Sequence, residues 1–540
     1  MSASDDRTAL AAEEAYRPPY LGAVLAGLGV FLLYAITLAP TTQFWDTSEY
    51  IATAHIMGIP HPPGNPLFVV LARAWELLLT PFGLPVAVRI NLFSAVQSAL
   101  AHAFWFLLAH RILAFFSTNR AFRLGGAAAA VLLSATAFTV WNQSNVNEKV
   151  YTVSLFTIAL LSWLAFRWRD HLGEGKDDNL LLLMVFILAL SVGNHLMAFL
   201  AAPALVVYIV VVRWRTLLNW KLYATAIVAA ILGLSIHLFL PIRAGLSPVI
   251  NEADPTCATM GSAFVSVVTM GRAGCEDLSE SLARKQYDKP SVFANPLDPT
   301  LPRDARFVTR QILNYAQYFD WQWARSVAGN LSWFGGLRPV LTLLFVFLGL
   351  LGAYTHWQKD RVSWLYVAIL FVTLSLGLTF YLNFKYGYTL PDSLMRRDFL
   401  AATGGNTQDL TEVRERDYFF IVSFSIWGLW AGVGIAALWQ SLTAWYAQRK
   451  SARPLLAASP VLALACLPLI LNWTWASRKH DYTARDWAYN LLMSVEPYGI
   501  VFTNGDNDTF PLWYAQEVEG IRKDVTVMVM SYLNTPWYVR

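Results

Sequence analysis

Charged residues are scarce in this chain of 540 residues, and their scarcity excludes several classes of protein. Asp, Glu, Lys and Arg make up 14% of the sequence, whereas a soluble domain carries about 25%. Hydrophobic residues account for 56%, too many for a disordered chain. The 40 basic and 36 acidic residues nearly cancel, so the net charge of +4 indicates no polyanionic partner. The composition therefore excludes a soluble enzyme, a disordered chain and a protein that binds nucleic acid.

Several long stretches contain no charged residue at all. They run over residues 18–45, 124–147, 179–212, 222–242, 339–358, 362–384, 418–448 and 454–477. A helix needs about 20 apolar residues to cross the hydrocarbon core of a bilayer, so each stretch can span it. Gly193, Asn194 and His195 interrupt the stretch 179–212, which predicts two short spans joined by a tight turn.

The sequence therefore predicts an all-α polytopic membrane protein with about eleven transmembrane helices. The predicted spans are 20–39, 86–110, 124–141, 150–166, two within 179–212, 222–240, 339–356, 362–383, 418–440 and 454–472. Residues 66–80 are too short to span and contain Arg73 and Glu76, which predicts a helix that lies at the membrane surface.

Lys and Arg in the short loops predict the orientation of the chain. They follow the second, fourth, sixth, eighth and tenth spans, which places those loops in the cytoplasm. We expect a multi-pass protein of the inner (cytoplasmic) membrane, whose first span is a retained anchor and not a cleaved signal peptide. The expected parts are a cytoplasmic N-terminus (1–19), a transmembrane domain (20–472) with outer loops 40–85, 241–337 and 383–416, and an extracytoplasmic C-terminal segment (473–540). The large polar segments lie outside, so the chemistry is expected there.

Cysteine is almost absent, and three residues cannot form a framework of disulfides. Cys466 lies inside an apolar span and is expected to be inert. Cys257 and Cys275 share one hydrophilic outer loop. A single disulfide there requires an oxidising compartment, and two free thiols are the alternative.

The first outer loop carries two acidic residues beside Trp45. If Asp46 opens a helix, Asp46 and Glu49 share one face. A carboxylate at a membrane boundary can be desolvated into a good proton acceptor. The alternative is that Asp46 only caps the helix.

The C-terminal segment predicts a small α/β unit. Strand-like stretches at 500–503 and 525–530 flank an apolar helix at 512–518. The loop after the first strand contains Asn504, Asp506 and Asp508, at the strand end where α/β folds bind ligands. This loop could bind a ligand or the acceptor, could hold a divalent metal (Mg²⁺ or Mn²⁺), or could simply form a turn. We assign no metal to it.

Aromatic and amide side chains gather in the long outer loop, at Tyr315, Gln317, Tyr318, Trp321, Gln322 and Trp323. They suit contacts with sugar or peptide, and they equally suit an amphipathic helix resting on the membrane. The second interpretation is favoured.

Six blocks in this order carry a resemblance to a known family. They are Asp46-x-x-Glu49-Tyr50, His61-Pro62-Pro63-Gly64, Val86-Ala87-Val88-Arg89-Ile90-Asn91, Leu240-Pro241-Ile242-Arg243-Ala244, Glu415-Arg416-Asp417-Tyr418-Phe419-Phe420 and Asn504-Gly505-Asp506-Asn507-Asp508-Thr509-Phe510-Pro511. The first outer loop resembles that of GT-C transmembrane glycosyltransferases, which use sugars carried on polyprenyl phosphate. More closely, the chain is similar to a bacterial family related to the animal transmembrane protein O-mannosyltransferase.

The resemblance implies an inverting transfer of a sugar, mannose or another hexose, from a polyprenyl-phosphate donor. Asp46 matches the acidic position that such enzymes use as a base. The implied acceptor is Ser or Thr of exported proteins, at the outer face of the membrane. Two alternatives stay open: a lipid or cell-surface glycan as the acceptor, or a transporter or flippase of lipid-linked sugar.

The leaving phosphate needs positive charge at the lipid–water boundary. Arg243 follows a span directly, and Arg414 and Arg416 precede one. Each could bind the donor phosphate through its planar fork or merely anchor its helix at the interface. The remaining candidates for binding the donor phosphate or sugar are His61, Glu148, His195, Lys385, Arg396 and Arg397. Glu148 could instead assist the base or pair with Lys149.

Overall fold

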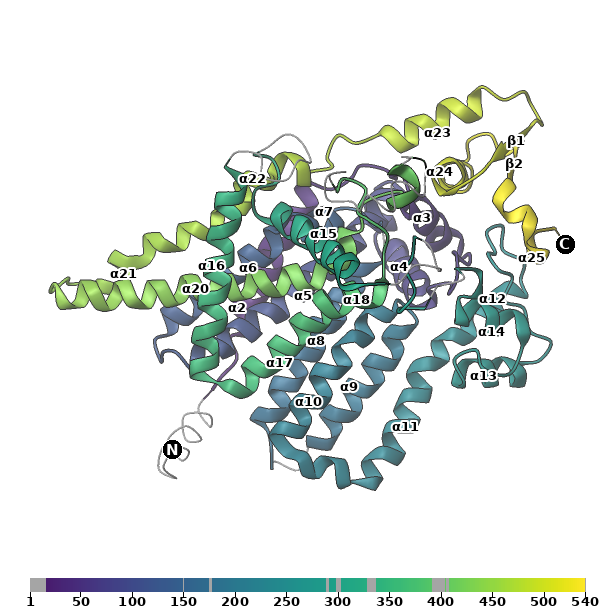
Figure 1. Ribbon diagram of the computed structural model, residues 1–540. Coiled ribbons are helices and arrows are strands. Elements are labelled where there is room, and N and C mark those ends of the chain that lie inside the picture. Colours follow the sequence, from purple (N-terminus) through teal and green to yellow (C-terminus); the bar gives the residue numbers. More distant parts are fainter. Residues whose placement is uncertain are drawn as a thin grey trace.

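The computed structural model describes residues 16–148, 150–173, 177–287, 291–297, 303–327, 337–390, 404 and 407–539 (Figure 1). Among these, eight helical segments are long and apolar enough to cross a membrane. They are Val86–Ala114, Tyr151–Asp170, Leu196–Leu218, Trp220–Ala244, Arg338–Lys359, Arg361–Leu382, Asp417–Gln448 and Pro454–Ala476. Helices α6 (Arg120–Thr136) and α7 (Phe138–Ser144) are bent by 71° to each other and count as a ninth segment if the pair is one span.

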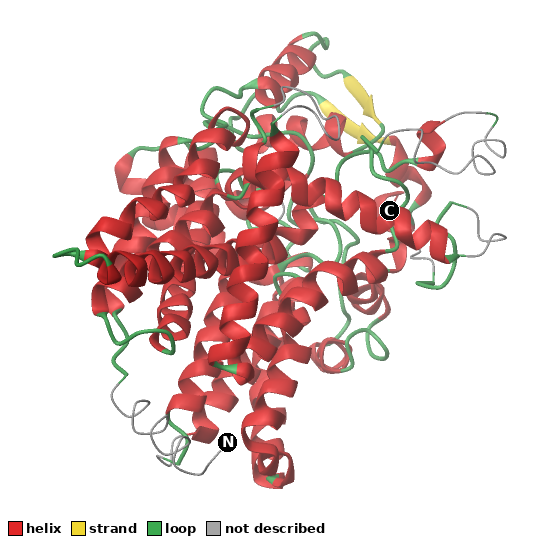
Figure 2. Ribbon diagram, turned by 60° about the vertical axis from the view of Figure 1, so that its left-hand side comes forward, coloured by secondary structure: helices red, strands yellow, loops and turns green. Residues whose placement is uncertain are grey.

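Two further apolar helices, α2 (Tyr20–Ile36) and α9 (Asp177–Val192), are shorter. Each of the eleven predicted spans therefore coincides with a helical segment, and the predicted all-α polytopic fold is confirmed. Figure 2 shows the helical body with its two short strands together at one end.

The predicted break in the stretch 179–212 is present. Helix α9 ends at Val192, and a 3-10 turn (Leu196–Ala201) leads into α10 (Ala202–Arg213). The Gly193 carbonyl accepts a hydrogen bond from the Leu67 amide (2.9 Å), and the Asn194 amide group donates to the Val150 carbonyl (3.1 Å). The turn is thus fixed to the ends of α4 (Pro66–Leu78) and α8 (Tyr151–Asp170).

Helix α20 (Ile421–Gln448) forms the centre of the helical body, between α6 and α16 (Arg338–Lys359). Small residues permit this close packing, because a Cβ on Gly432 would lie 2.2 Å from the Ala130 Cα. The N-terminal end of α20 follows closely on Arg414 and Arg416, so this buried helix gives those residues a rigid support.

Helix α15 (Ala305–Ala324) corrects one expectation. Its side chains Tyr318, Trp321 and Trp323 are at most 2% exposed, so they do not rest on a membrane surface. The helix packs against α16 and α22 (Leu467–Ala476), and the Gln322 side chain accepts from the Thr139 amide (2.9 Å). The aromatic composition reflects burial within the protein.

The polar ends of the body carry the remaining elements. Residues 40–85 hold α3 (Asp46–Ile56) and α4. Helix α12 (Phe239–Ala244) ends the segment Trp220–Ala244, and α13 (Met260–Val268) and α14 (Glu276–Ala283) follow it. The C-terminal segment holds α23 (Thr483–Met493), β1 (Ile500–Thr503), α24 (Asp506–Glu517), β2 (Thr526–Val529) and α25 (Pro536–Val539). Strands β1 and β2 pair in parallel, with Ile500 opposite Thr526, and α24 packs on α3 (Figure 1).

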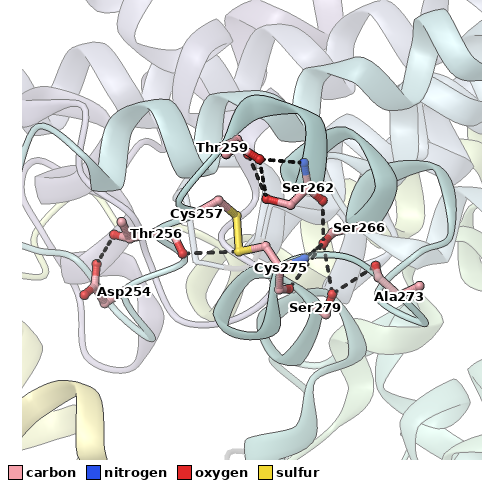
Figure 3. Close-up of a disulfide and its surroundings, with 9 residues drawn as sticks. All are labelled: Asp254, Thr256, Cys257, Thr259, Ser262, Ser266, Ala273, Cys275 and Ser279. Atoms are coloured by element: carbon pink, nitrogen blue, oxygen red, sulfur yellow. Dashed lines mark hydrogen bonds between the residues drawn. A yellow bond between two sulfur atoms is a disulfide. The ribbon is translucent and has the colours of Figure 1, made fainter.

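Cys257 and Cys275 form a disulfide that joins the segment before α13 to the start of α14 (Figure 3). The Cys275 amide also donates to the Ser266 hydroxyl on α13 (2.8 Å). Cys466 is free.

Replacing Cys257 and Cys275 together by Ser is expected to lower the free energy of unfolding of this loop by about 3 kcal/mol, because the closed loop restricts the unfolded chain. Thermal unfolding without reductant measures the effect, and Cys466→Ser is the matched control. Thiol alkylation of unfolded protein without reductant should label Cys466 alone; labelling of all three cysteines would contradict the disulfide.

Candidate functional site

Helix α3 places both predicted acidic residues in its first turn, where the helix dipole favours negative charge. Asp46 is 5% exposed and Glu49 is fully buried. The preceding residue, Trp45, has a positive φ of 64°, a strained conformation for an aromatic residue. Its amide donates to the Asn507 side chain of α24 (2.7 Å). The start of α3 is therefore held by the C-terminal segment.

His61 lies between the two carboxylates. Its Nδ1 is 2.6 Å from Glu49 Oε2, and its backbone amide donates to Glu49 Oε1 (2.6 Å). On the other side of the ring, Nε2 lies 3.9 Å from Asp46 Oδ2. The shared face expected for Asp46 and Glu49 is thus the face that receives His61.

Arg414 supplies a positive charge beside Asp46. Its Nη2 lies 3.9 Å from Asp46 Oδ1, and its Nη1 lies 3.5 Å from Glu148 Oε1. The guanidinium packs over the rings of Trp45 (4.2 Å) and Tyr418 (4.9 Å), and the side chain is only 10% exposed. Its Nε and Nη1 have no hydrogen-bond acceptor among the described residues, so this cation retains donors for an anion.

Glu148, shortly before the start of α8, completes the cluster. It accepts a hydrogen bond from Gln143 (3.0 Å) and lies 3.5 Å from Arg478 Nη2. The suggested partner Lys149 lies outside the described residues. The motifs did not indicate Gln143 or Arg478. Arg478 could have been found, because it directly follows the last span, the same signal that singled out Arg243.

Four other candidates, Arg416, Arg243, His195 and Lys385, have different partners in the structure. Arg416 pairs with Glu412 (2.8 Å) and donates to the Tyr418 hydroxyl (2.8 Å). Arg243 donates to the backbone carbonyls of Met57 and Ile56 at the end of α3.

His195 Nδ1 accepts from the Met197 amide (3.1 Å), and its ring packs edge-on against Tyr151 (4.9 Å). Lys385 donates to the Asp409 carbonyl (3.3 Å). Arg396 and Arg397 lie outside the described residues.

In the C-terminal loop Asn504–Asp508, the residue that contacts the start of α3 is not one of the three that the sequence singled out. Helix α24 begins at Asp506, earlier than predicted, because the Asp508 carboxylate caps it by accepting from the amides of Asn504 (2.7 Å) and Gly505 (2.8 Å). The contact with α3 comes from Asn507, which was not singled out. Within the described part of the chain, no three or more His, Cys, Asp or Glu side chains are arranged to hold a metal ion.

Two family models match the chain. "Protein O-mannosyl-transferase TMEM260 N-terminal domain" matches residues 46–218, and "TMEM260-associated domain 2" matches residues 484–540. The first match contains Asp46, Glu49, His61 and Glu148, and the second contains Asn507.

Curated relatives carry the same name. "Protein O-mannosyl-transferase TMEM260" of Mus musculus is 23% identical over 524 residues, which cover 96% of this chain and 64% of the mouse protein. The Dictyostelium discoideum protein is 24% identical over 240 residues, or 42% of this chain and 28% of its own length. This chain thus spans less than two thirds of either relative. The resemblance to the animal O-mannosyltransferase is confirmed.

Among solved structures, the crystal structure of ArnT from Cupriavidus metallidurans bound to undecaprenyl phosphate is similar to this chain. The match covers 95% of this chain and 90% of ArnT, at 12% sequence identity and a TM-score of 0.47.

Proposed function

Because this chain is related to the TMEM260 protein O-mannosyl-transferases in two separate segments, we propose that it is a membrane glycosyltransferase. In this proposal it transfers mannose or another hexose from a polyprenyl-phosphate donor to Ser or Thr of exported proteins. The observation that carries the proposal is the buried Asp46 carboxylate, which faces both an arginine with unused donors and a histidine held by a second carboxylate.

Asp46 acts as the base in this mechanism. Its carboxylate takes the proton of the acceptor hydroxyl, whose oxygen forms a bond to the anomeric carbon of the sugar. The bond from that carbon to the lipid phosphate breaks on the opposite face, so the configuration inverts. Burial beside Trp45 removes water that would otherwise stabilise the carboxylate and compete with the acceptor.

Arg414 stabilises the negative charge that develops on the leaving phosphate. The carboxylates of Asp46 and Glu148 position its guanidinium, and the rings of Trp45 and Tyr418 limit its movement. Charge-assisted hydrogen bonds from arginine to phosphate are among the strongest in proteins.

The helices that carry the site also indicate that it lies at the outer face of the membrane. Glu148 and Tyr151 lie at the start of α8, whereas Arg167 and Arg169 lie in its last turn. Arg169 pairs with Asp360 (2.6 Å), at the connection between α16 and α17 (Arg361–Val372). Because basic loops face the cytoplasm, the opposite ends of these helices, which carry the site, face outward.

Transfer can be tested with the purified chain in lipid nanodiscs, a polyprenyl-phosphate mannose and a peptide containing one Ser. We expect the mass of the peptide to increase by one hexose, and the increase to disappear when Ser is replaced by Ala. A hexose found only on added lipid or glycan would keep the donor chemistry but assign the acceptor to the alternative. No transfer from any polyprenyl-phosphate hexose to any acceptor would overturn the proposal.

A further inference from the structure

A third carboxyl group, Glu252, lies behind Glu49 and has no part in the mechanism above. It comes from the long outer loop after α12 and is only 2% exposed. Its Oε2 accepts a hydrogen bond from the Tyr532 hydroxyl (2.9 Å), and its Oε1 has no conventional donor among the described residues. A buried carboxylate oxygen without a donor is costly, which favours a protonated acid here.

The backbone fixes Glu252 beside the segment that leads to His61. Ile59 forms a parallel bridge with Asn251. The Ile59 amide donates to the Ile250 carbonyl (2.8 Å), and the Glu252 amide donates to the Ile59 carbonyl (3.1 Å). The position of Glu252 is therefore coupled to the loop that carries His61.

The carboxyl group of Glu252 lies against that of Glu49, and two buried carboxyl groups in contact can form a hydrogen bond only when one of them carries a proton. Burial and the negative charge of Glu49 raise the pKa of Glu252 well above its ordinary value, and Asp506 adds to the rise. The hydrogen bond from the Tyr532 hydroxyl partly offsets this rise in the pKa of Glu252, and Tyr287 also faces this carboxyl group. Since Glu49 already accepts two hydrogen bonds from His61, the shared proton belongs on Glu252.

We propose that Glu252 is a positioning residue of the transfer site, whose acid proton holds Glu49 so that Glu49 fixes the ring of His61. This inference rests on the proposed function. With Nδ1–H donated to Glu49, Nε2 is the nitrogen that faces Asp46. His61 Nε2 can then receive the proton that Asp46 has taken from the acceptor, which returns Asp46 to its carboxylate form.

The first test is the pH dependence of thermal unfolding, which needs neither donor nor acceptor. Because the pKa of Glu252 is raised, its stabilising contribution is complete below the ordinary value near 4.5 and is lost as the pH rises through the raised pKa. The melting temperature of the wild-type protein should therefore fall as the pH is raised above the ordinary pKa of a glutamic acid and Glu252 loses its proton. Glu252→Gln should remove most of that slope, because Gln donates to Glu49 without titrating.

The second test is the pH profile of kcat for the same variants. Glu252→Gln should retain activity at neutral pH, and its activity should persist to higher pH than that of the wild-type protein. Glu252→Ala, which leaves no donor for Glu49, should lower kcat roughly 10- to 100-fold, because the ring of His61 is no longer held. Glu280→Gln, an exposed residue of the same loop that pairs with Lys285, is the matched control and should behave as wild type.

The outcomes separate the two proposals. Two results would overturn the role of Glu252 while transfer by the wild-type protein stands. One is an unchanged slope of melting temperature against pH in Glu252→Gln. The other is a decrease of kcat at alkaline pH that occurs at the same pH in Glu252→Gln as in the wild-type protein. Absence of transfer by the wild-type protein would instead overturn the proposed function, and the positioning role with it.

Discussion

Replacing Asp46 by Asn is expected to reduce the turnover of sugar transfer by a factor on the order of 10² or more. Asn has the shape of Asp but cannot accept the proton of the acceptor hydroxyl. It still opens α3, and the Trp45–Asn507 hydrogen bond does not involve its side chain. Folding and donor binding should therefore remain nearly intact. Steady-state kinetics with a saturating donor, together with donor affinity and melting temperature, measure the effect.

The matched control is Asp486→Asn, which changes an exposed aspartate of α23 that pairs with Arg485. Its turnover should equal that of the wild-type protein. Near-normal turnover in a well-folded Asp46→Asn variant would remove Asp46 as the base, and Glu148 or Glu49 would become the candidate.

Replacing Arg414 by Ala is expected to weaken donor binding by about 10- to 100-fold, since a hydrogen bond to a charged group contributes about 1.5–3 kcal/mol. The side chain has unused donors, and its guanidinium lies 3.9 Å from the Asp46 carboxylate. Arg414→Lys should recover part of the affinity, because it restores the charge but not the planar fork. Titration of the purified protein in nanodiscs with a polyprenyl-phosphate sugar gives the affinities.

Arg416→Ala is an informative comparison, because the motifs suggested Arg416 as a phosphate ligand. In the structure its guanidinium is occupied by Glu412 and Tyr418, so its loss should affect donor binding less than that of Arg414. Arg485→Ala, on the exposed surface of α23, should leave donor affinity unchanged. Unchanged affinity in Arg414→Ala would assign that residue to holding Asp46 and Glu148 in place.

The transmembrane helices could be predicted because the bilayer excludes charge over a fixed thickness. A long stretch without Asp, Glu, Lys or Arg therefore identifies a membrane-spanning helix. The break at Gly193 and the helix start at Asp46 could also be predicted, because each is determined by residues adjacent in the sequence. The burial of α15 was not predictable, because Trp and Tyr suit both a membrane surface and a protein interior.

The site was only partly predictable from the sequence. Asp46, Glu49, His61, Glu148 and Arg414 were singled out by residue type at a helix boundary or by a motif, and the structure brings these five together. Glu252 carries no such signal, because its position depends on pairing with Ile59, distant in the sequence. Asn507 was missed because the aspartates on either side of it are the residue type that binds metals and polar ligands. In the structure, however, Asp508 caps α24.

The hydrogen bond between Trp45 and Asn507 joins residues that are 462 positions apart. At a synthesis rate of about 5–20 residues per second, the ribosome needs on the order of 20 to 90 s to proceed from one to the other. In the orientation proposed for the chain, the first outer loop has already crossed the membrane during that interval, but the start of α3 lacks the partner that holds its strained backbone. The proposed site would thus be completed only after residue 507 had been synthesised and had reached the same side of the membrane.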